Sequence, residues 1–104
     1  MIRRAAFADP ETWVGTATTE PGVVSAWHHH GDHTTYIFCA RGGIRIESGP
    51  GGSDAVEGRA GDFIKIPPHV VHREANPSDD EQLVVLARVG SGPIVVNVDE
   101  PDPA

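Results

Sequence analysis

Short runs of β-branched and aromatic residues recur along the chain between turn-forming residues, and no apolar pattern of helical period lasts for three turns. Of the 104 residues, 12 are glycine and 9 are proline, which is too rich in turn formers for a helical bundle. The hydrophobic share of 38% is too high for a disordered chain, and the length suits one domain. The sequence therefore predicts a single all-β domain over residues 1–104, built as a sandwich or a barrel.

Eight short strands are expected, separated by Gly, Pro, Asn and Asp residues. Their predicted ranges are 12–18, 23–28, 34–40, 44–47, 63–66, 71–75, 83–89 and 94–98. Residues 42–43, both glycine, supply positive φ for a hairpin, residues 48–53 form a flexible loop, and residues 57–62 turn the chain again. The tail 99–104 is expected to fray or to lie on the surface.

The chain carries 8 basic and 15 acidic side chains, which gives a formal net charge of -7. This charge argues against nucleic acid and anionic membrane surfaces as partners, because both are themselves negative. The longest uninterrupted apolar stretches, 36–40 and 83–87, are far shorter than the roughly 20 residues that span a bilayer. No apolar h-region follows the N-terminal arginine pair, and the single Cys39 cannot form an intrachain disulfide. We therefore expect a cytoplasmic protein without a nucleic-acid or membrane partner.

Histidine is the most unevenly distributed residue type. All 6 histidines lie between positions 28 and 72, and four of them fall within six consecutive residues. On a strand, side chains at i and i+2 share a face, so His28 and His30 can converge on one ion while His29 points the other way. A third ligand must then come from another strand. Two histidines remain for that role, His69 and His72.

Two stretches of the chain have the spacing of known motifs. In residues 22–42, a glycine, the pair His28 and His30, position 35 and a final glycine match the spacing of G-x5-H-x-H-x3 or 4-E-x6-G. In residues 61–76, a glycine, a proline, His72 and a final asparagine match the spacing of G-x5-P-x-G-x2-H-x3-N. These are the two motifs of the cupins, and the chain resembles that family in both, in the right order.

The resemblance implies a double-stranded β-helix, the cupin jelly roll, with a divalent metal held inside the barrel by His28, His30 and His72. Two positions depart from the family pattern, because Thr35 replaces the glutamate ligand and His69 replaces a glycine. A threonine hydroxyl is a feeble ligand, so we expect Thr35 to face the metal without binding it and the site to hold three neutral imidazoles. Fe(II) is favoured as the metal, with manganese, nickel and zinc as alternatives.

The predicted function is that of a small-molecule oxygenase, because the cupin dioxygenases that act on thiols and on β-diketones also use three histidines without the glutamate. Two other functions stay open. One is a non-catalytic cupin that binds or senses a small molecule around a structural metal, and the other is a metal-assisted isomerase or hydrolase. Glu74 is the candidate base in the last case, since it lies two residues beyond His72. Glu74 could instead orient a ligand histidine, or pair near the surface with Arg73 or Arg88.

The remaining polar candidates have competing structural roles. His33 could supply a fourth nitrogen to the metal or lie in a solvated loop, and His69 could line the pocket mouth or cap the turn after the prolines. His29 is expected on the exterior. Cys39 has the parity of Thr35 and is expected to be a small core residue rather than a nucleophile. The three proposed ligands could themselves be histidines that only form hydrogen bonds inside a degenerate pocket.

Trp27, Tyr36 and Phe38 have the opposite parity to the proposed ligands and are expected on an outer sheet face. Large aromatic side chains are costly to leave in water, so this face should be covered by another part of the chain or by a second subunit. We predict a homodimer, with residues 12–14 as the segment that crosses to the partner.

Overall fold

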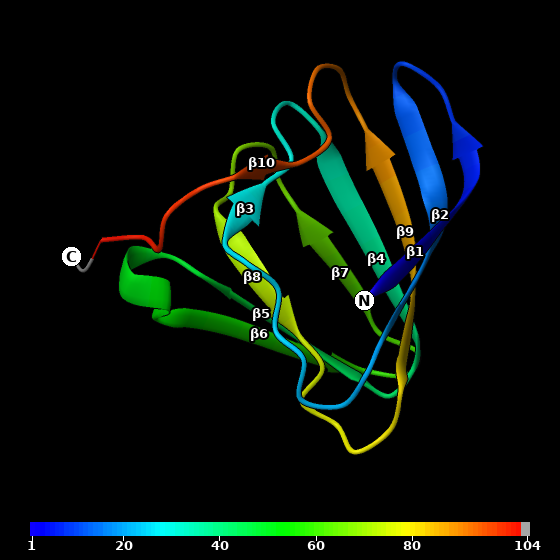
Figure 1. Ribbon diagram of the computed structural model, residues 1–104, viewed down its shortest axis with the longest axis vertical. Coiled ribbons are helices and arrows are strands. Elements are labelled where there is room, and N and C mark those ends of the chain that lie inside the picture. The colour runs from blue at the N-terminus through cyan, green and yellow to red at the C-terminus, as the bar shows by residue number, and fades with distance from the viewer. Residues whose placement is uncertain (103–104) are drawn as a thin grey trace.

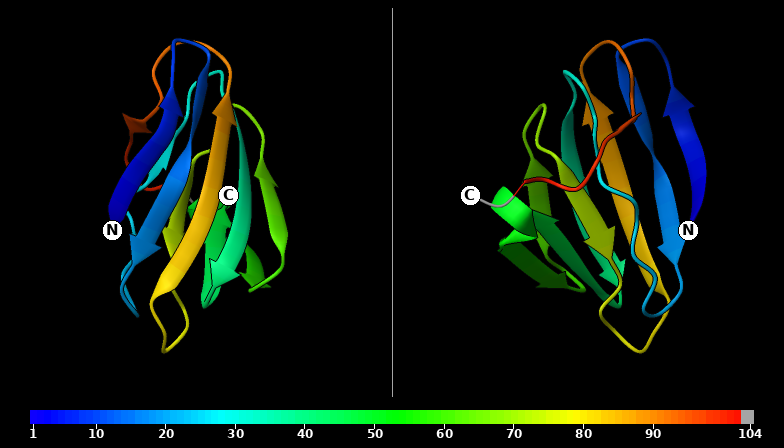
Figure 2. Two further views of the ribbon diagram at one scale, coloured as in Figure 1. Left: turned by 90° about the vertical axis from the view of Figure 1, so that its right-hand side faces the viewer. Right: turned by 60° about the vertical axis from the view of Figure 1, so that its left-hand side comes forward.

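The computed structural model describes residues 1–102 and consists of two antiparallel β-sheets that face each other (Figure 1). Each sheet has five strands, and the chain passes repeatedly from one sheet to the other. Segments that are far apart in the sequence therefore line the same interior, as the turned views show (Figure 2). The predicted all-β architecture is confirmed.

The two sheets differ in which parts of the chain they contain. In order across it, the first sheet contains β1 (Ile2–Ala8), β2 (Thr12–Thr19), β9 (Gln82–Val89), β4 (Thr34–Arg41) and β7 (Phe63–Ile66). The second sheet contains, again in order, β10 (Val96–Asn97), β3 (His28–His29), β8 (His72–Ala75), β5 (Gly43–Ser48) and β6 (Asp54–Arg59). A short 3-10 turn, η1 (Pro50–Gly52), lies between β5 and β6. No helix among the described residues is long and apolar enough to cross a membrane.

The core lies between the sheets, where alternate residues of each strand point inward. On β9, for example, Val84 and Leu86 are buried while Val85 and Val89 are exposed. The buried apolar cluster consists of Ala17, Ile37, Cys39, Ile44, Ile46, Ile66, Val84 and Leu86. Cys39 is therefore a core residue, as its parity predicts.

A row of side chains crosses the inner face of the first sheet near one end of its strands. Arg88 on β9 is paired with Trp13 on β2 and with Thr35 on β4. Thr35 is paired in turn with Ile66 on β7. Directly paired residues point to the same face of a sheet, and Arg88, Thr35 and Ile66 are all buried. Two polar side chains therefore reach the interior at this level of the sheet.

Most predicted strands are observed. Six match to within one residue: 12–18, 34–40, 44–47, 63–66, 71–75 and 83–89. Two observed strands are shorter than predicted. Only β10 forms within residues 94–98, and the segment 23–28 forms only the start of β3 and an isolated bridge between Val24 and Ala75. Val23 and Val24 are exposed, so burial of their side chains contributes little to stabilising a regular strand there.

The sequence does not predict β1 and β6, which lie at the edges of the two sheets. Every residue of β1 is exposed, and β6 is exposed except for its glycine, so neither strand shows the alternation of a half-buried strand. The glycines at 42–43 do not close the predicted hairpin. Gly42 has a φ of 78°, but β4 and β5 belong to different sheets, and the chain crosses between the sheets at this point.

The aromatic residues predicted on an outer face have different surroundings. Trp27 is only 9% exposed, because the side chain of Arg73 covers its ring with Cζ 4.8 Å from the ring centroid. Tyr36 is 46% exposed, and the ring centroids of Phe38 and Phe63 lie 4.8 Å apart on the same open face. The chain itself thus covers Trp27, whereas the face around Tyr36 stays open.

Two segments near the chain ends were given surface roles by the sequence. Residues 12–14 lie in β2, which pairs with β1 on one side and with β9 on the other. Both edges of this segment are used within the chain, which leaves it no free edge for a partner. Of the tail 99–104, residues 103–104 lie outside the described part of the chain. Asp102 lies against η1, where its carbonyl oxygen accepts a hydrogen bond of 3.0 Å from the N–H of Gly51.

Candidate metal centre

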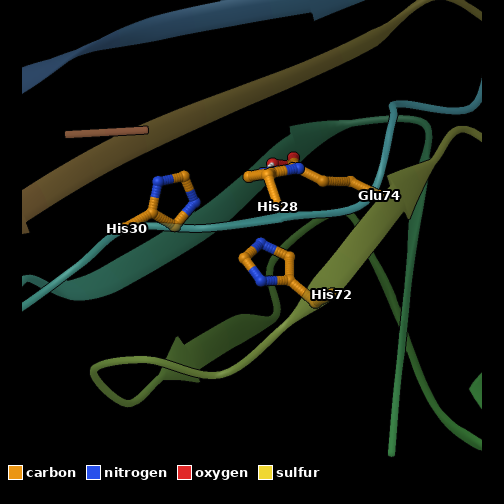
Figure 3. Close-up of side chains that lie close together, drawn as sticks. All are labelled: His28, His30, His72 and Glu74. Atoms are coloured by element: carbon orange, nitrogen blue, oxygen red, sulfur yellow. Dashed lines mark ion pairs between the residues drawn. The ribbon is translucent and has the colours of Figure 1, made fainter. Parts of the chain in front are cut away.

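Three histidines and one glutamate, on strands of the second sheet or just beyond one, bring their ligating atoms together in the interior (Figure 3). These atoms belong to His28, His30, His72 and Glu74 and all lie within 4.8 Å of one another. His28 on β3 is paired directly with His72 on β8, and Glu74 follows on the same face of β8. His30 lies just beyond the end of β3. The structure therefore brings together the three predicted ligands and adds a carboxylate to them.

A backbone carbonyl orients each of the three imidazoles. Each Nδ1 atom lies 2.7 to 2.8 Å from a carbonyl oxygen, in the pairs His28 with Ala26, His30 with Ile94 and His72 with Val70. A carbonyl only accepts hydrogen bonds, so Nδ1 carries the proton and the neutral ring presents the lone pair of Nε2 to the interior. All three Nε2 atoms are buried and lack a hydrogen-bond partner in the described chain. This orientation is the one that metal ligation through Nε2 requires.

Glu74 contributes a negative charge to the cluster. Its side chain is buried, and its Oε1 atom lies 3.5 Å from Nε2 of His28. Burial raises the pKa of this carboxyl, but nearby positive charge, including the guanidinium of Arg88, lowers it by more, to about 2. Glu74 is therefore an anion at neutral pH. Its burial excludes one of the predicted roles, an ion pair with an arginine near the surface.

Two of the three imidazoles, those of His30 and His72, are neutral near pH 7. Burial, followed by the positive charge of Arg88, lowers the pKa of His30 to about 3. Burial is also the main cause that lowers the pKa of His72. Only the neutral form of histidine binds a metal, so at neutral pH a metal ion would not compete with protons for these two rings.

The inner face of the first sheet carries two more buried polar side chains. Thr35 and Arg88 are each 1% exposed. The Thr35 hydroxyl and the Nε and Nη2 atoms of Arg88 have no hydrogen-bond partner within the described residues. Thr35 occupies the glutamate position of the cupin motif, but it is not one of the four grouped residues. From the sequence, Arg88 is expected only as a surface partner of Glu74, although its parity with the buried residues of β9 is a signal for the interior.

The other histidines lie outside the ligand group. His33 is buried rather than solvated, and its Nδ1 atom lies 3.0 Å from the carbonyl oxygen of His30, but it is not among the grouped ligands. The exposed side chain of His69 lies against another loop, with its Nε2 atom 2.6 Å from Oδ1 of Asp32. Its φ of 62° is a left-handed conformation that favours glycine, the residue of the family motif at this position. The half-buried ring of His29 accepts a backbone hydrogen bond away from the group.

A cleft with a volume of about 400 Å³ opens beside the ligand group. Its lining residues are Met1, Arg3, Val23, Val24, Ser25, Ala26, His28, Val95 and Asn97. His28 is the member of the ligand group that borders this cleft. The cleft therefore borders the ligand group at His28, whose Nε2 atom is itself buried.

The donor set suits a divalent transition metal. Imidazole nitrogens together with a carboxylate oxygen are ligands for Fe(II), Mn(II), Ni(II) and Zn(II). Nitrogen lone pairs that face a carboxylate repel it unless a cation lies between them. The cluster could therefore hold a metal ion. Its identity does not follow from the ligands, and the ligand set contains a carboxylate that the predicted three-histidine site lacks.

Comparisons with known proteins agree with this fold. A family model described as a cupin domain matches residues 15–89. Among solved structures, the chain is similar to a protein with a double-stranded β-helix domain from Klebsiella pneumoniae, at 18% identity and a TM-score of 0.81, covering 95% of this chain and 84% of that chain. It is also similar to a cupin-2 domain protein from Shewanella frigidimarina, at 17% identity and a TM-score of 0.69, covering 85% of this chain and 79% of that chain.

A third similar structure is an oxalate oxidase in complex with the substrate analogue glycolate. It shares 22% identity and a TM-score of 0.70, and the match covers 85% of this chain and 46% of that chain. No curated protein sequence matches the chain significantly. Because the family model matches well over half of its length, the chain belongs to the cupin domain family.

Proposed function

We propose that this cupin is a metal-dependent enzyme that oxidises small molecules, with Fe(II) held by His28, His30, His72 and Glu74. One observation carries the proposal: three inward Nε2 atoms without partners in the described chain lie beside a buried carboxylate. Backbone hydrogen bonds already hold the rings in the orientation for ligation. A metal that prefers six ligands would keep open positions for a small molecule and for dioxygen.

The residues of the chain supply binding, orientation and electrostatics. A bound Fe(II) ion supplies the redox chemistry that lets dioxygen react with an organic molecule. The histidines hold the ion, and the carboxylate of Glu74 offsets one of its positive charges. The ligands are at most 5% exposed, so bulk water is kept away from the reacting centre. Thr35 on β4 carries a buried hydroxyl without a partner among the described residues, which can donate a hydrogen bond to a bound molecule.

The alternatives use the same cluster in other ways. In a metal-assisted isomerase or hydrolase, Glu74 would have to accept a proton, and a pKa of about 2 makes it a weak base. In a binding or sensing cupin, the metal would be structural, and such sites are usually closed. The cleft that borders His28 instead supports a site that a small molecule can approach. The glycolate in the similar oxalate oxidase is a small acid, which supports a small-molecule substrate here.

Anaerobic reconstitution with Fe(II), followed by oxygen-uptake measurements, tests the proposal. The loaded protein is mixed in turn with thiols, β-diketones, phenolic acids and small hydroxy acids. We expect uptake with one of these classes, and loss of both metal and uptake in His72→Ala. His69→Ala is the matched control, because His69 lies outside the ligand group. A metal-loaded wild type without oxygen uptake would contradict the oxygenase, and full metal content in His72→Ala would contradict the site.

A further inference from the structure

Arg88 is a buried charge that the proposed metal site does not use. Its side chain is 1% exposed, and none of the ion pairs among the described residues includes it. Glu74, the carboxylate whose charge acts on Arg88, belongs to the ligand group on the opposite sheet. Burying an unpaired guanidinium is costly unless an anion compensates it. An anion that binds in the interior would therefore compensate the positive charge of Arg88.

The unpaired atoms of Arg88 form a recognition edge. Nε and Nη2 are the two nitrogens without partners in the described chain, and their N–H groups point in parallel from one edge of the guanidinium plane. A carboxylate accepts two hydrogen bonds from such a fork, with one bond to each oxygen. Trp13 lies over the guanidinium, with Cζ 5.3 Å from the ring centroid, and stabilises its position. The fork is thus held in place by the packing of the chain itself.

The neighbours of this edge extend the site toward the metal ligands. Thr35 is paired with Arg88 across β4 and β9, and its buried hydroxyl also lacks a partner in the part of the chain described. The charge of Arg88 contributes to the lowered pKa values of His30 and Glu74, so it lies within electrostatic reach of both. Arg88 and Thr35 thus provide unpartnered hydrogen-bond donors on the inner face of the first sheet, opposite the sheet that carries the ligand group.

We propose that Arg88 binds the carboxylate of a small acidic substrate, whose second donor atom reaches the metal. This inference rests on the proposed function, because it assigns a substrate class to the same site. A divalent ion together with Arg88 would outweigh the single negative charge of Glu74, so an anionic substrate would be held more tightly than a neutral one of the same shape. Arg3 lines the cleft beside His28 and adds positive charge along the approach.

Titration of the Co(II)-loaded protein tests the assignment, because the visible absorption of Co(II) changes with its ligands. The probes are glycolate, a two-carbon hydroxy acid, and glycolamide, its neutral amide. We expect wild type to prefer glycolate by roughly 10- to 100-fold, the usual worth of charge-assisted hydrogen bonds. Arg88→Gln should lose that preference, and Arg59→Gln, an exposed arginine on β6, should keep it. If Arg88 had only a structural role, Arg88→Gln would lower the affinities for both probes equally and leave their ratio unchanged.

Two results would overturn the assignment: no preference for the acid in wild type, or an unchanged preference in Arg88→Gln. Arg88→Lys covers the case in which Arg88→Gln does not fold, because it keeps the charge and loses the fork. It should bind glycolate several-fold more weakly, and wild-type affinity in Arg88→Lys would contradict binding through the fork.

Elemental analysis of the same samples separates this inference from the proposed function. An empty metal site would overturn the proposed function, whatever the probes do. Arg88 is then tested in the metal-free protein, where glycolate should raise the melting temperature of wild type and not of Arg88→Gln. An equal rise in both proteins would overturn the role of Arg88.

Discussion

The Oε1 atom of Glu74 lies 3.5 Å from Nε2 of His28, and the proton of that imidazole lies on its other nitrogen, toward a backbone carbonyl. A carboxylate that faces a lone pair is favourable only when a proton or a metal lies between them. In the cupin motif the carboxylate comes from the position of Thr35 on β4, in the first sheet. Here the buried carboxylate comes from β8 in the second sheet. Glu74 on β8 thus supplies a negative charge that the cupin motif places at the position of Thr35 on β4.

This relationship predicts a large effect of Glu74→Gln on metal binding. The amide keeps the shape of the side chain and removes the charge that offsets the ion, so the affinity for a divalent metal should fall by roughly 10- to 100-fold. Thr35→Ala is the control and should bind metal like wild type, since Thr35 lies outside the ligand group. Competition with a chelator measures both affinities. Equal affinity in Glu74→Gln and wild type would favour a site of three histidines alone.

The convergence of the three histidines could be predicted from the sequence because local rules are sufficient for it. His28 and His30 are two residues apart, and the motif spacing selects His72 as the third. The register then places His28 directly opposite His72. The fold class follows in the same way, because alternation on strands such as β9 depends only on which face is buried.

The rest depends on how distant segments meet. The parity of Glu74 indicates the interior, but whether its carboxylate lies among histidines or beside an arginine is decided by how the two sheets close. Arg88 has inward parity, yet arginine is rarely buried, so its residue type argues for the surface. The exposed strand β1 has no apolar face to mark it and exists through its pairing with β2.

The metal-free protein should lose stability as the pH falls from about 7 to about 5. Burial, followed by the charge of Arg88, lowers the pKa of His30 from 6.5 to about 3 in the folded chain. Below pH 6.5 the unfolded chain takes up a proton here that the folded chain excludes, so protonation favours unfolding. The cost is at most about 1.4 kcal/mol per pH unit for one group. The lowered pKa of His72 acts in the same direction.

Denaturant unfolding of the metal-free protein at several pH values measures this slope. The lowered pKa of Glu74 does not interfere, because that carboxyl loses its stabilising effect only as the pH falls below its ordinary value of 4.5. His30→Gln is the matched variant and should show a shallower slope, since it has no proton to take up at this position. A pH-independent stability of wild type over this range would contradict the lowered pKa values.

His69→Gly should stabilise the protein relative to His69→Ala. The φ of 62° at this position costs a residue with a Cβ atom roughly 1 kcal/mol, and glycine avoids that cost. Both variants lose the contact between His69 and Asp32, whose side chains are 63% and 66% exposed and which contributes little. Comparing the two variants therefore isolates the backbone term. Chemical denaturation showing His69→Ala to be the more stable variant would mean that the turn tolerates this conformation without strain.

The open outer face of the first sheet carries an apolar groove of about 160 Å³. It is lined by Tyr36, Ile37, Phe38, Phe63, Val85 and Ala87. Phe63 is 78% exposed at the edge strand β7, and Tyr36 is 46% exposed beside it on β4. Exposed apolar patches of this kind mark interfaces. We propose that a second copy of the chain covers this groove in a homodimer.

Phe63→Lys should therefore dissociate the homodimer, because a charged side chain at the centre of an apolar contact would be buried without a partner. Light scattering at micromolar concentration should give wild type twice the chain mass of 11.0 kDa and the variant a single chain mass. Val56→Lys is the control, since Val56 is 56% exposed on β6 of the other sheet and should leave the dimer intact. A wild-type mass near 11.0 kDa would show that the groove faces water in a monomer. Dissociation by Val56→Lys and not by Phe63→Lys would move the interface to the second sheet.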